Sequence, residues 1–303
     1  MTCVPEEWAV SQATHHGGAG REFVAALPGL AEEFLGRWGL TATGPSMHGA
    51  ASLVLPVRRG SDGVPAALKF QLPDEETRGE PLALCAWGGE GAVRLLDHDP
   101  ESGTMLLERA DELRPLSALP DAREAVRVLA GLLARLTAVP APDGLRRLGA
   151  VAARMLADAP AAAALLDGAG AALLRDCAAV VREVAGEPGD RLLHWDLHRG
   201  NVLAARDPER GPWLAIDPKP LAGDPGFELL PVLAGGREGR VDPAELLWRF
   251  DLLVEEVVGD RGRAFAWTMG RVLQNGLWAV EDGASVLAPD QMAIAGILLA
   301  RRT

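Results

Sequence analysis

His194-Trp-Asp-Leu-His-Arg-Gly-Asn201 is the densest polar cluster in this sequence of 303 residues. Apolar pairs stand on both sides of it, Leu192-Leu193 before and Val202-Leu203 after, so we expect a polar loop between two short buried strands. A second loop is expected further along, because the apolar run Trp213-Leu-Ala-Ile leads into Asp217. Together the two loops offer an Asp, an Asn and a second Asp at the ends of short strands.

This spacing, Asp-x4-Asn and then an Asp at the end of an apolar strand, is typical of kinases. In that arrangement Asp196 would accept the proton of a substrate hydroxyl, while Asn201 and Asp217 would hold Mg²⁺. Oxygen ligands suit this hard cation, which also binds nucleotide phosphates. The alternative is a polar loop in which these residues only cap turns. That alternative does not explain why other residues typical of kinases precede this loop in the order that kinases have.

The first of those features is a lysine on a strand. Only two of the 30 basic residues are lysine, Lys69 and Lys219, and Lys69 lies in a short apolar run that follows a turn. The kinase lysine that steadies the α- and β-phosphates occupies such a strand, although an edge-strand lysine is the alternative. Glu76 and Glu80 follow four residues apart, so either could pair with Lys69, and the distance to the next strand favours Glu80. The loop Gly44-Pro-Ser-Met-His-Gly49 would cover the phosphates with backbone amides.

The pattern of apolar and polar residues changes along the chain. From about residue 44 to 110, short β-like runs alternate with turns, and Ser52–Val57 with Ala66–Phe70 reads as a hairpin. After Asp111 helical patterns dominate, as in Asp121–Val139, where apolar residues share one face and a capping box begins the helix. A further helix is expected over Arg21–Trp38, interrupted at Pro28-Gly29.

The sequence therefore predicts an α+β, bilobal fold of the protein-kinase-like kind. Residues 1–110 are expected to form an N-terminal nucleotide-binding lobe, a small antiparallel β-sheet with one helix. Residues 111–303 are expected to form a larger, mainly helical lobe that carries the catalytic and substrate-binding groups.

Composition limits the function further. Hydrophobic residues make up 48% and charged residues 24%, which is the balance of an ordinary globular protein. The formal charge of −12 argues against nucleic acid or anionic lipid as a partner and favours cations. Three widely separated cysteines suggest neither a zinc site nor a disulfide framework. We see no secretory signal and no long apolar segment, so we expect a cytoplasmic protein with no membrane contact, and a monomer.

The order and spacing of these residues resemble the aminoglycoside phosphotransferase branch of the protein-kinase-like fold. More narrowly, several stretches are similar to the streptomycin 6-phosphotransferases, whose relatives include hydroxyurea phosphotransferases. These stretches are Gly88-Gly-Glu-Gly-Ala-Val-Arg-Leu-Leu-Asp-His-Asp99, His194-Trp-Asp-Leu-His198, Trp213-Leu-Ala-Ile-Asp-Pro218, Gly223-Asp-Pro-Gly-Phe227, and Leu273-Gln-Asn275 with Glu281-Asp-Gly283. The resemblance extends from Glu22 to the C-terminus.

The resemblance implies a site and a substrate. It implies ATP with Mg²⁺ as the phosphoryl donor and streptomycin as the acceptor, phosphorylated on a streptidine-ring hydroxyl to give antibiotic resistance. The residues that it assigns are Asp196 for catalysis, Asn201 and Asp217 for the metal, Lys69 for the phosphates, and the backbone of Glu108-Arg-Ala110 for adenine. Glu80, as the partner of Lys69, and Gly49, in the loop that covers the phosphates, complete the predicted nucleotide site. Most of the wider family has Gly at Trp195, but the streptomycin branch resembles this sequence there.

Acceptor binding is expected to involve carboxylates. Streptomycin carries two guanidinium groups, so an acidic cleft would both attract it and pair with it. The candidates are Asp224, Glu228, Glu281 and Asp282. Each could instead be a solvated or capping acid, and Asp224 is favoured because it lies in a stretch that belongs to the resemblance.

Three alternatives stay open. The same chemistry could act on hydroxyurea or another small metabolite. A metal-dependent hydrolase could use His194, Asp196 and His198 as ligands, although the sequence offers no matching second cluster. A nucleotide-binding regulator without catalysis is the third alternative, and the complete Lys, Asp, Asn, Asp set argues against it.

Overall fold

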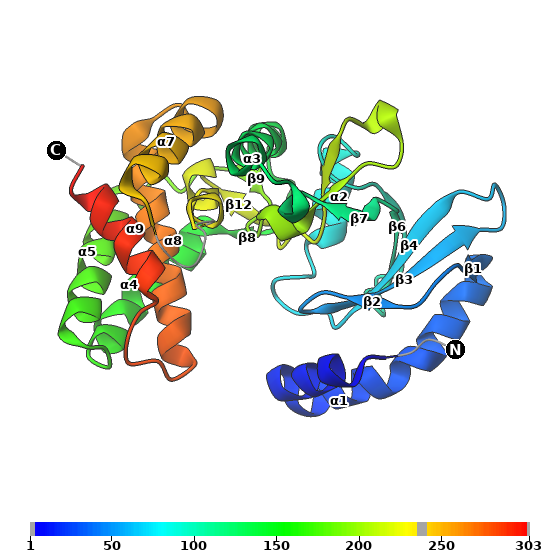
Figure 1. The fold of residues 1–303 in the computed structure, drawn as a ribbon. Helices are drawn as coiled ribbons and strands as arrows, with labels where there is room; N and C mark the ends of the chain where they lie inside the picture. Colours follow the sequence, from blue (N-terminus) through cyan, green and yellow to red (C-terminus); the bar gives the residue numbers. More distant parts are fainter. Residues whose placement is uncertain (1–3, 235–240, 302–303) are drawn as a thin grey trace.

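The computed structural model describes residues 4–234 and 241–301, which form a β-sheet lobe followed by a larger helical lobe (Figure 1). This confirms the expected α+β, bilobal architecture. The buried hydrophobic residues form two clusters, a smaller one between α1 and the sheet and a larger one that runs through the helical lobe. Helix α2 (Glu80–Trp87) packs into the larger cluster, so it connects the lobes. The division at residue 110 stays a prediction.

The small lobe is built on an antiparallel sheet. Its strands stand in the order β1 (Leu40–Ala42), β3 (Ser52–Arg59), β4 (Pro65–Gln71), β6 (Met105–Glu108) and β5 (Leu95–His98), and β2 (Met47–His48) pairs with β3. The expected hairpin is the β3–β4 pair, in which Val54 lies opposite Lys69. Side chains alternate between the two faces of a strand, so Leu68 and Phe70 face α1 while Lys69 faces the interior between the lobes.

Helix α1 (Glu6–Arg37) covers the outer face of this sheet (Figure 1). The helix begins at Glu6 and not at Arg21, where the sequence predicted its start. It also continues through Pro28, where a break was expected, and its non-helical residue is Gly17, with φ of 58°. Proline fixes φ near the helical value and loses only one backbone hydrogen bond. The burial of Leu27 and Phe34 against the sheet outweighs that loss.

The large lobe is organised around α8 (Arg261–Glu281), whose residues are almost all buried from Ala264 to Leu277. Helices α4, α5 and α9 pack against it. Asp121 caps α3 and accepts hydrogen bonds from two backbone amides, as the sequence predicted. The helices of this lobe are α3 (Ala122–Thr137), α4 (Leu148–Ala163), α5 (Gly168–Val184), α6 (Leu230–Leu233), α7 (Pro243–Leu253), α8 and α9 (Pro289–Leu299).

Short strands in the large lobe carry the polar loops. One sheet has the order β11 (Trp213–Ala215), β10 (Val202–Ala204), β7 (Asp111–Pro115), and the other β8 (Arg146–Arg147), β12 (Leu221–Gly223), β9 (Arg191–Leu193). The first polar loop lies between β9 and β10, and the second between β11 and β12. The Lys219 N–H donates to the His194 carbonyl at 3.0 Å, which fixes the two loops side by side.

No helix within the described ranges combines the length and the apolar character that crossing a bilayer requires.

Candidate active site

A buried ion cluster stands where the two lobes meet. Lys69 Nζ donates to both carboxylate oxygens of Glu80 at 2.7 Å and to Asp217 Oδ1 at 2.5 Å. The Lys69 side chain is 3% exposed and that of Glu80 is 1% exposed. Burial alone would lower the pKa of Lys69, but Asp217 and Glu80 outweigh it and raise that pKa above its ordinary value. The ammonium group therefore stays charged.

The partner of Lys69 is Glu80 and not Glu76, because of where α2 begins. Residues 74–78 form a turn in which Asp74 accepts the backbone N–H groups of Glu76 and Thr77, each at 2.8 Å. The regular helix starts only at Glu80. Gly79 allows a close approach there, since a Cβ atom at this position would lie 2.6 Å from Leu145 Cδ2 and 2.9 Å from Pro220 Cγ.

His194 supports the first polar loop from within. Its Nε2 donates to the Ile216 carbonyl at 3.0 Å, Nδ1 accepts from the Asp196 N–H at 3.4 Å, and the ring stacks on Trp87. Burial lowers the pKa of His194 to about 4, so the ring is neutral. Within the described residues no group of three or more His, Cys, Asp or Glu could hold a metal ion. The geometry therefore gives no support to a hydrolase centre of His194, Asp196 and His198.

Asp196 and Asn201 meet across this loop. Asn201 Nδ2 donates to the Asp196 carbonyl at 3.0 Å and to Asp196 Oδ2 at 3.4 Å, and Lys219 Nζ donates to the same Oδ2 at 3.0 Å. The Asp196 side chain is 26% exposed, so its carboxylate reaches open space. These donors converge on Oδ2, whereas Oδ1 lies 4.0 Å from His198 Nε2, beyond hydrogen-bond distance, so Oδ1 is the oxygen open to a substrate hydroxyl.

Two residues of the site have left-handed backbones, Trp195 with φ of 64° and Asp217 with φ of 57°. Such a backbone costs about 1–2 kcal/mol for a residue with a side chain. For Trp195 the surroundings offset the cost. Its N–H donates to Glu228 Oε1 at 2.6 Å, and the guanidinium groups of Arg146 and Arg271 lie 4.3 and 5.1 Å from its ring.

A cavity of 260 Å³ lies between the sheet and the polar loops. Apolar side chains of Val54, Leu107 and Leu203 line it and suit the faces of a flat base. Arg210 donates to the Glu108 carboxylate at 2.9 and 3.0 Å, so the Glu108 side chain holds the stretch Glu108-Arg-Ala110 in place. Of the residues predicted for the nucleotide and the metal, the cavity brings together Gly49, Lys69, Glu108, Ala110, Asn201 and Asp217.

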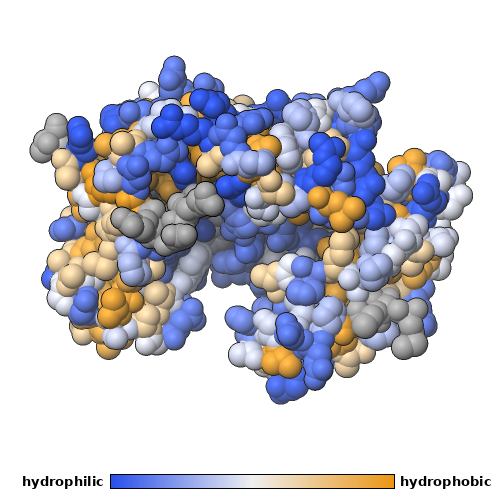
Figure 2. Space-filling model, in the orientation of Figure 1, coloured by the Kyte–Doolittle hydropathy of each residue, from blue (hydrophilic) through white to orange (hydrophobic). Residues whose placement is uncertain are grey.

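On the other side of Asp196 lie two further spaces of similar size, 260 and 250 Å³, in the hydrophilic notch between the lobes (Figure 2). The first is lined by Glu76, Trp195, Asp196, Lys219, Arg271 and Trp278. The second shares Glu76, Trp195 and Trp278 with it and adds three carboxylates, Glu75, Asp158 and Glu281. We call these two spaces together the acceptor cavity. Asp196 lines the acceptor cavity, and Asn201, which donates to it, lines the nucleotide cavity, so the loop that carries both residues separates the two cavities.

The four carboxylates expected to bind the acceptor have different positions. Asp224 is 5% exposed, and Arg263 donates to its Oδ2 at 2.6 and 2.8 Å. Glu228 is buried under Trp195, where burial raises its pKa to about 7. Neither lines the acceptor cavity. Glu281 does, and Asp282 is exposed just beyond α8.

Sequence reasoning missed several lining residues, because they come from separate elements. Glu75 and Glu76 lie in the turn before α2, Asp158 on α4, and Arg271 and Trp278 on α8. No motif joins positions so far apart. Lys219 had a signal, since it is one of two lysines among 30 basic residues.

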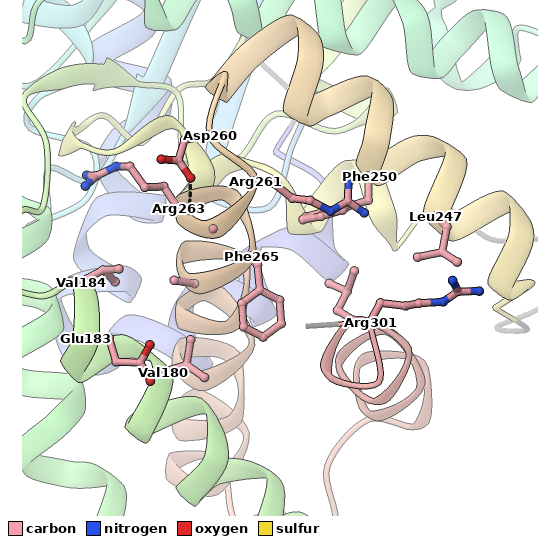
Figure 3. A pocket seen from close by; sticks show the side chains of 13 residues that line it. Val180, Glu183, Val184, Leu247, Phe250, Asp260, Arg261, Arg263, Phe265 and Arg301 are labelled. Carbon is pink, nitrogen blue, oxygen red and sulfur yellow. Dashed lines mark hydrogen bonds between the residues drawn. The ribbon is translucent and has the colours of Figure 1, made fainter. Parts of the chain in front are cut away.

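A larger cavity, of 490 Å³, lies away from this site among α5, α7, α8 and α9 (Figure 3). Two of its polar side chains, Asp260 and Arg263, stabilise the fold. Asp260 caps α8 by accepting the Arg263 N–H at 3.0 Å, and the Arg263 guanidinium is bound by Asp224. We assign it no catalytic role.

Known proteins resemble this chain over nearly its whole length. Residues 37–283 match the family model described as "Aminoglycoside/hydroxyurea antibiotic resistance kinase". A hydroxyurea phosphotransferase of Kitasatospora aureofaciens is 61% identical over 98% of this chain and 86% of its own. A streptomycin 6-kinase of Streptomyces glaucescens is 55% identical over 97% of this chain and 96% of its own.

Solved structures agree with the fold. A thermostable mutant of the aminoglycoside phosphotransferase APH(4)-Ia, in a ternary complex with ADP and hygromycin B, matches with a TM-score of 0.59 at 14% identity. The match covers 89% of this chain and 96% of that one. A choline/ethanolamine kinase family protein from Mesorhizobium loti matches with a TM-score of 0.56 at 18% identity, over 90% of this chain and 93% of that one. These matches confirm the expected protein-kinase-like fold.

The ion cluster can be tested through stability. We expect Glu80→Gln to lower the free energy of unfolding by about 1–3 kcal/mol, because a buried ammonium loses one of its two anionic partners. The matched control is Glu76→Gln, whose half-exposed side chain should change stability by less than about 0.5 kcal/mol. Urea unfolding followed by circular dichroism measures both. Equal effects would show that the buried pair does not stabilise the lobe junction.

Proposed function

The chain belongs to the aminoglycoside/hydroxyurea antibiotic resistance kinases, and we propose that it transfers the γ-phosphoryl group of ATP, bound with Mg²⁺, to a streptidine-ring hydroxyl of streptomycin. It is an aminoglycoside phosphotransferase of the kind that confers antibiotic resistance. A monomeric state, a cytoplasmic location and the absence of a nucleic-acid partner stay predictions.

One observation supports the proposed reaction above the others, namely that the loop carrying Asp196 and Asn201 separates two cavities of different character. On one side lie Lys69, Asn201 and Asp217, the groups that handle phosphate and metal in kinases. On the other lies the carboxylate-lined acceptor cavity. A hydroxyl that entered from the second side would meet Asp196 with the γ-phosphorus beyond it.

The residues at the nucleotide cavity fit Mg²⁺. Asn201 and Asp217 provide hard oxygen donors from adjacent loops, and Asp217 holds a strained backbone at this point. Burial would raise the pKa of Asp217, but Lys69 and Lys219 outweigh it and hold that pKa below its ordinary value, so the carboxylate is charged. When bound there, the cation would neutralise charge on the β- and γ-phosphates.

The protein groups would then act in sequence. Lys69, fixed by Glu80, would hold the α- and β-phosphates, and the loop at Gly49 would cover them. Asp196 Oδ1 would accept a hydrogen bond from the acceptor hydroxyl and orient its oxygen toward phosphorus. Asn201 would keep Asp196 in place through the two hydrogen bonds from its amide.

The acceptor cavity supports a cationic acceptor. Five carboxylates line the cavity, namely Asp196, Glu75, Glu76, Asp158 and Glu281, together with four cations, namely Lys219, Arg271, Arg146 and Arg154. Arg154 lies 3.6 Å from Glu75 and Arg146 lies 4.0 Å from Glu76. Guanidinium groups pair with carboxylates through two parallel hydrogen bonds, so an acceptor guanidinium would pair with Asp158 and Glu281, and with Glu75 in competition with Arg154. Of the residues expected from the sequence, Glu281 keeps a place in this proposal. The geometry gives Asp224 and Glu228 no direct contact with the acceptor.

Hydroxyurea is the second candidate acceptor. The relative that is 61% identical is named a hydroxyurea phosphotransferase. A small neutral acceptor would need only the space beside Asp196, lined by Trp195, Lys219 and Arg271, and not the carboxylates further out.

The role of Asp196 predicts a loss of turnover. We expect Asp196→Asn to lower kcat by about 10²–10⁴-fold, the usual contribution of a positioned acid–base group, with little change in MgATP affinity. Asp207→Asn is the control, because this exposed carboxylate only caps a turn. A coupled assay of ADP release measures both. An Asp196→Asn enzyme with normal turnover would contradict the proposed mechanism.

Asp217 is expected to act on nucleotide binding itself. Its replacement by alanine should abolish the Mg²⁺-dependent part of ATP affinity, because the carboxylate is the proposed charged ligand of the metal. Calorimetric titration of ATP with Mg²⁺ and with EDTA separates that part from the rest. Undiminished affinity in Mg²⁺ would place the metal elsewhere.

The two acceptors can be separated by charge. We expect the double variant Glu75→Gln, Glu281→Gln to raise the KM for streptomycin about two- to thirtyfold, since each of the two partly exposed ion pairs contributes about 0.2–1 kcal/mol. The KM should also rise with ionic strength, whereas hydroxyurea should show neither effect. The double variant Glu255→Gln, Glu256→Gln removes the same charge from exposed positions outside the cavity. A streptomycin KM that is insensitive to charge and salt would favour the neutral acceptor.

A further inference from the structure

The side chains of both lysines lie at the active site, Lys69 at the nucleotide cavity and Lys219 at the acceptor cavity. Arginine accounts for the other 28 of the 30 basic residues, yet the two positions that face the reacting groups carry lysine. Lys69 is explained by its contacts to Glu80 and Asp217. Lys219 belongs to no assigned part of the site, although its Nζ donates to Asp196 Oδ2 at 3.0 Å.

The backbone fixes Lys219 firmly. It stands between Pro218 and Pro220, whose rings restrict the chain on both sides, and its own N–H donates to the His194 carbonyl. Pro220 approaches Gly79 just before α2, and Leu221 then enters β12. The Lys219 ammonium therefore has a defined position relative to Asp196.

Lys219 also faces open space. Its side chain is 26% exposed and lines the acceptor cavity together with Asp196 and Arg271. A hydroxyl bound to Asp196 Oδ1 would be separated from the Lys219 ammonium only by the carboxylate group of Asp196. The ammonium would therefore lie near the transferred phosphoryl group.

We propose that Lys219 is a further catalytic residue, whose ammonium passes from the Asp196 carboxylate to the transferred phosphoryl group during the reaction. This inference rests on the role proposed for Asp196. In the ground state the ammonium neutralises Asp196 Oδ2. As transfer proceeds, it stabilises negative charge on the phosphoryl oxygens.

The bond changes explain why the cation would move. The acceptor oxygen forms a bond to the γ-phosphorus, and the bond from that phosphorus to the bridging oxygen breaks, leaving its electron pair on ADP. The hydroxyl proton passes to Asp196 Oδ1, so the carboxylate becomes neutral. Lys219 loses its anionic partner at the moment when the phosphate ester beside it carries negative charge, and it pairs with that ester.

This role favours lysine over arginine. An ammonium group is a compact charge on a flexible stem and can turn from one oxygen to another. A guanidinium is a broad planar fork that binds a carboxylate through two hydrogen bonds and would stay on Asp196. A lysine that merely anchored Asp196 would be replaceable by arginine, so the exchange distinguishes the two roles.

The test compares Lys219→Met, Lys219→Ala and Lys219→Arg with the full-length wild-type protein, with MgATP and either streptomycin or hydroxyurea as acceptor. We expect Lys219→Met to lower kcat about 10²–10³-fold, as the loss of one transition-state donor does, with the KM for MgATP changed less than about threefold. Lys219→Arg should keep the fold and still lose about tenfold or more in kcat.

Chemical rescue tests whether the reaction needs a positive charge at this place, while Lys219→Arg separates transfer of that charge from anchoring of Asp196. Propylammonium should restore turnover of Lys219→Ala at least about tenfold and with saturation, whereas neutral propanol should not. Arg261→Gln is the charge-matched control and should keep wild-type kinetics, because exposed Arg261 pairs with Asp251 outside both cavities. Asp196→Asn should not respond to the amine.

The outcomes separate this inference from the proposed function. Wild-type turnover in Lys219→Met or in Lys219→Arg, a defect confined to KM, or the absence of amine rescue would each overturn the role of Lys219, while an inactive Asp196→Asn would leave the proposed mechanism in place. If Lys219→Met and Lys219→Ala did not fold, Lys219→Arg would still decide through its kcat. Normal turnover in Asp196→Asn would overturn the proposed function itself.

Discussion

The contact of Lys69 with Glu80 and Asp217 is the interaction on which the rest of the site depends. The lysine comes from the sheet, the glutamate from α2 and the aspartate from the loop after β11, so one buried cluster joins three parts of the chain. Removing one charge from this cluster is destabilising, because it leaves a buried group without its counter-ion. The cluster therefore fixes how the β-sheet lobe faces the helical lobe, and with it the position of the nucleotide cavity.

A second constraint acts on the acceptor side of Asp196. Trp195 holds a left-handed backbone, its N–H donates to Glu228, and the guanidinium groups of Arg146 and Arg271 lie 4.3 and 5.1 Å from its ring. The indole also contacts Trp278 and Phe227. Burial lowers the pKa of Arg271 to about 10, which still leaves the guanidinium charged at neutral pH. The side chains packed around Trp195 therefore support the loop that carries Asp196 where it borders the acceptor cavity.

Much of the small lobe and of the phosphate-handling site followed from local patterns. The β3–β4 hairpin, the capped start of α3, and the short strands around His194–Asn201 all occur where the sequence predicted them. Helix α1 did not, because the burial of Leu27 and Phe34 against the sheet is a tertiary effect that no window around Pro28 contains. The choice between Glu76 and Glu80 also depended on a turn, held by Asp74, that precedes the helix.

The sequence by itself determined the chemistry of the site, since the order and spacing of Lys69, Asp196, Asn201 and Asp217 point to phosphoryl transfer whatever surrounds them. Only the tertiary structure decided which charges meet the acceptor. It buried Asp224 against Arg263 and Glu228 beneath Trp195, and it brought Glu75, Asp158 and Glu281 to one cavity from a turn and two helices. The physical reason is that residue types and short spacings, such as the spacing of five residues from Asp196 to Asn201, are written in the sequence, whereas a cavity between elements exists only after the elements have packed.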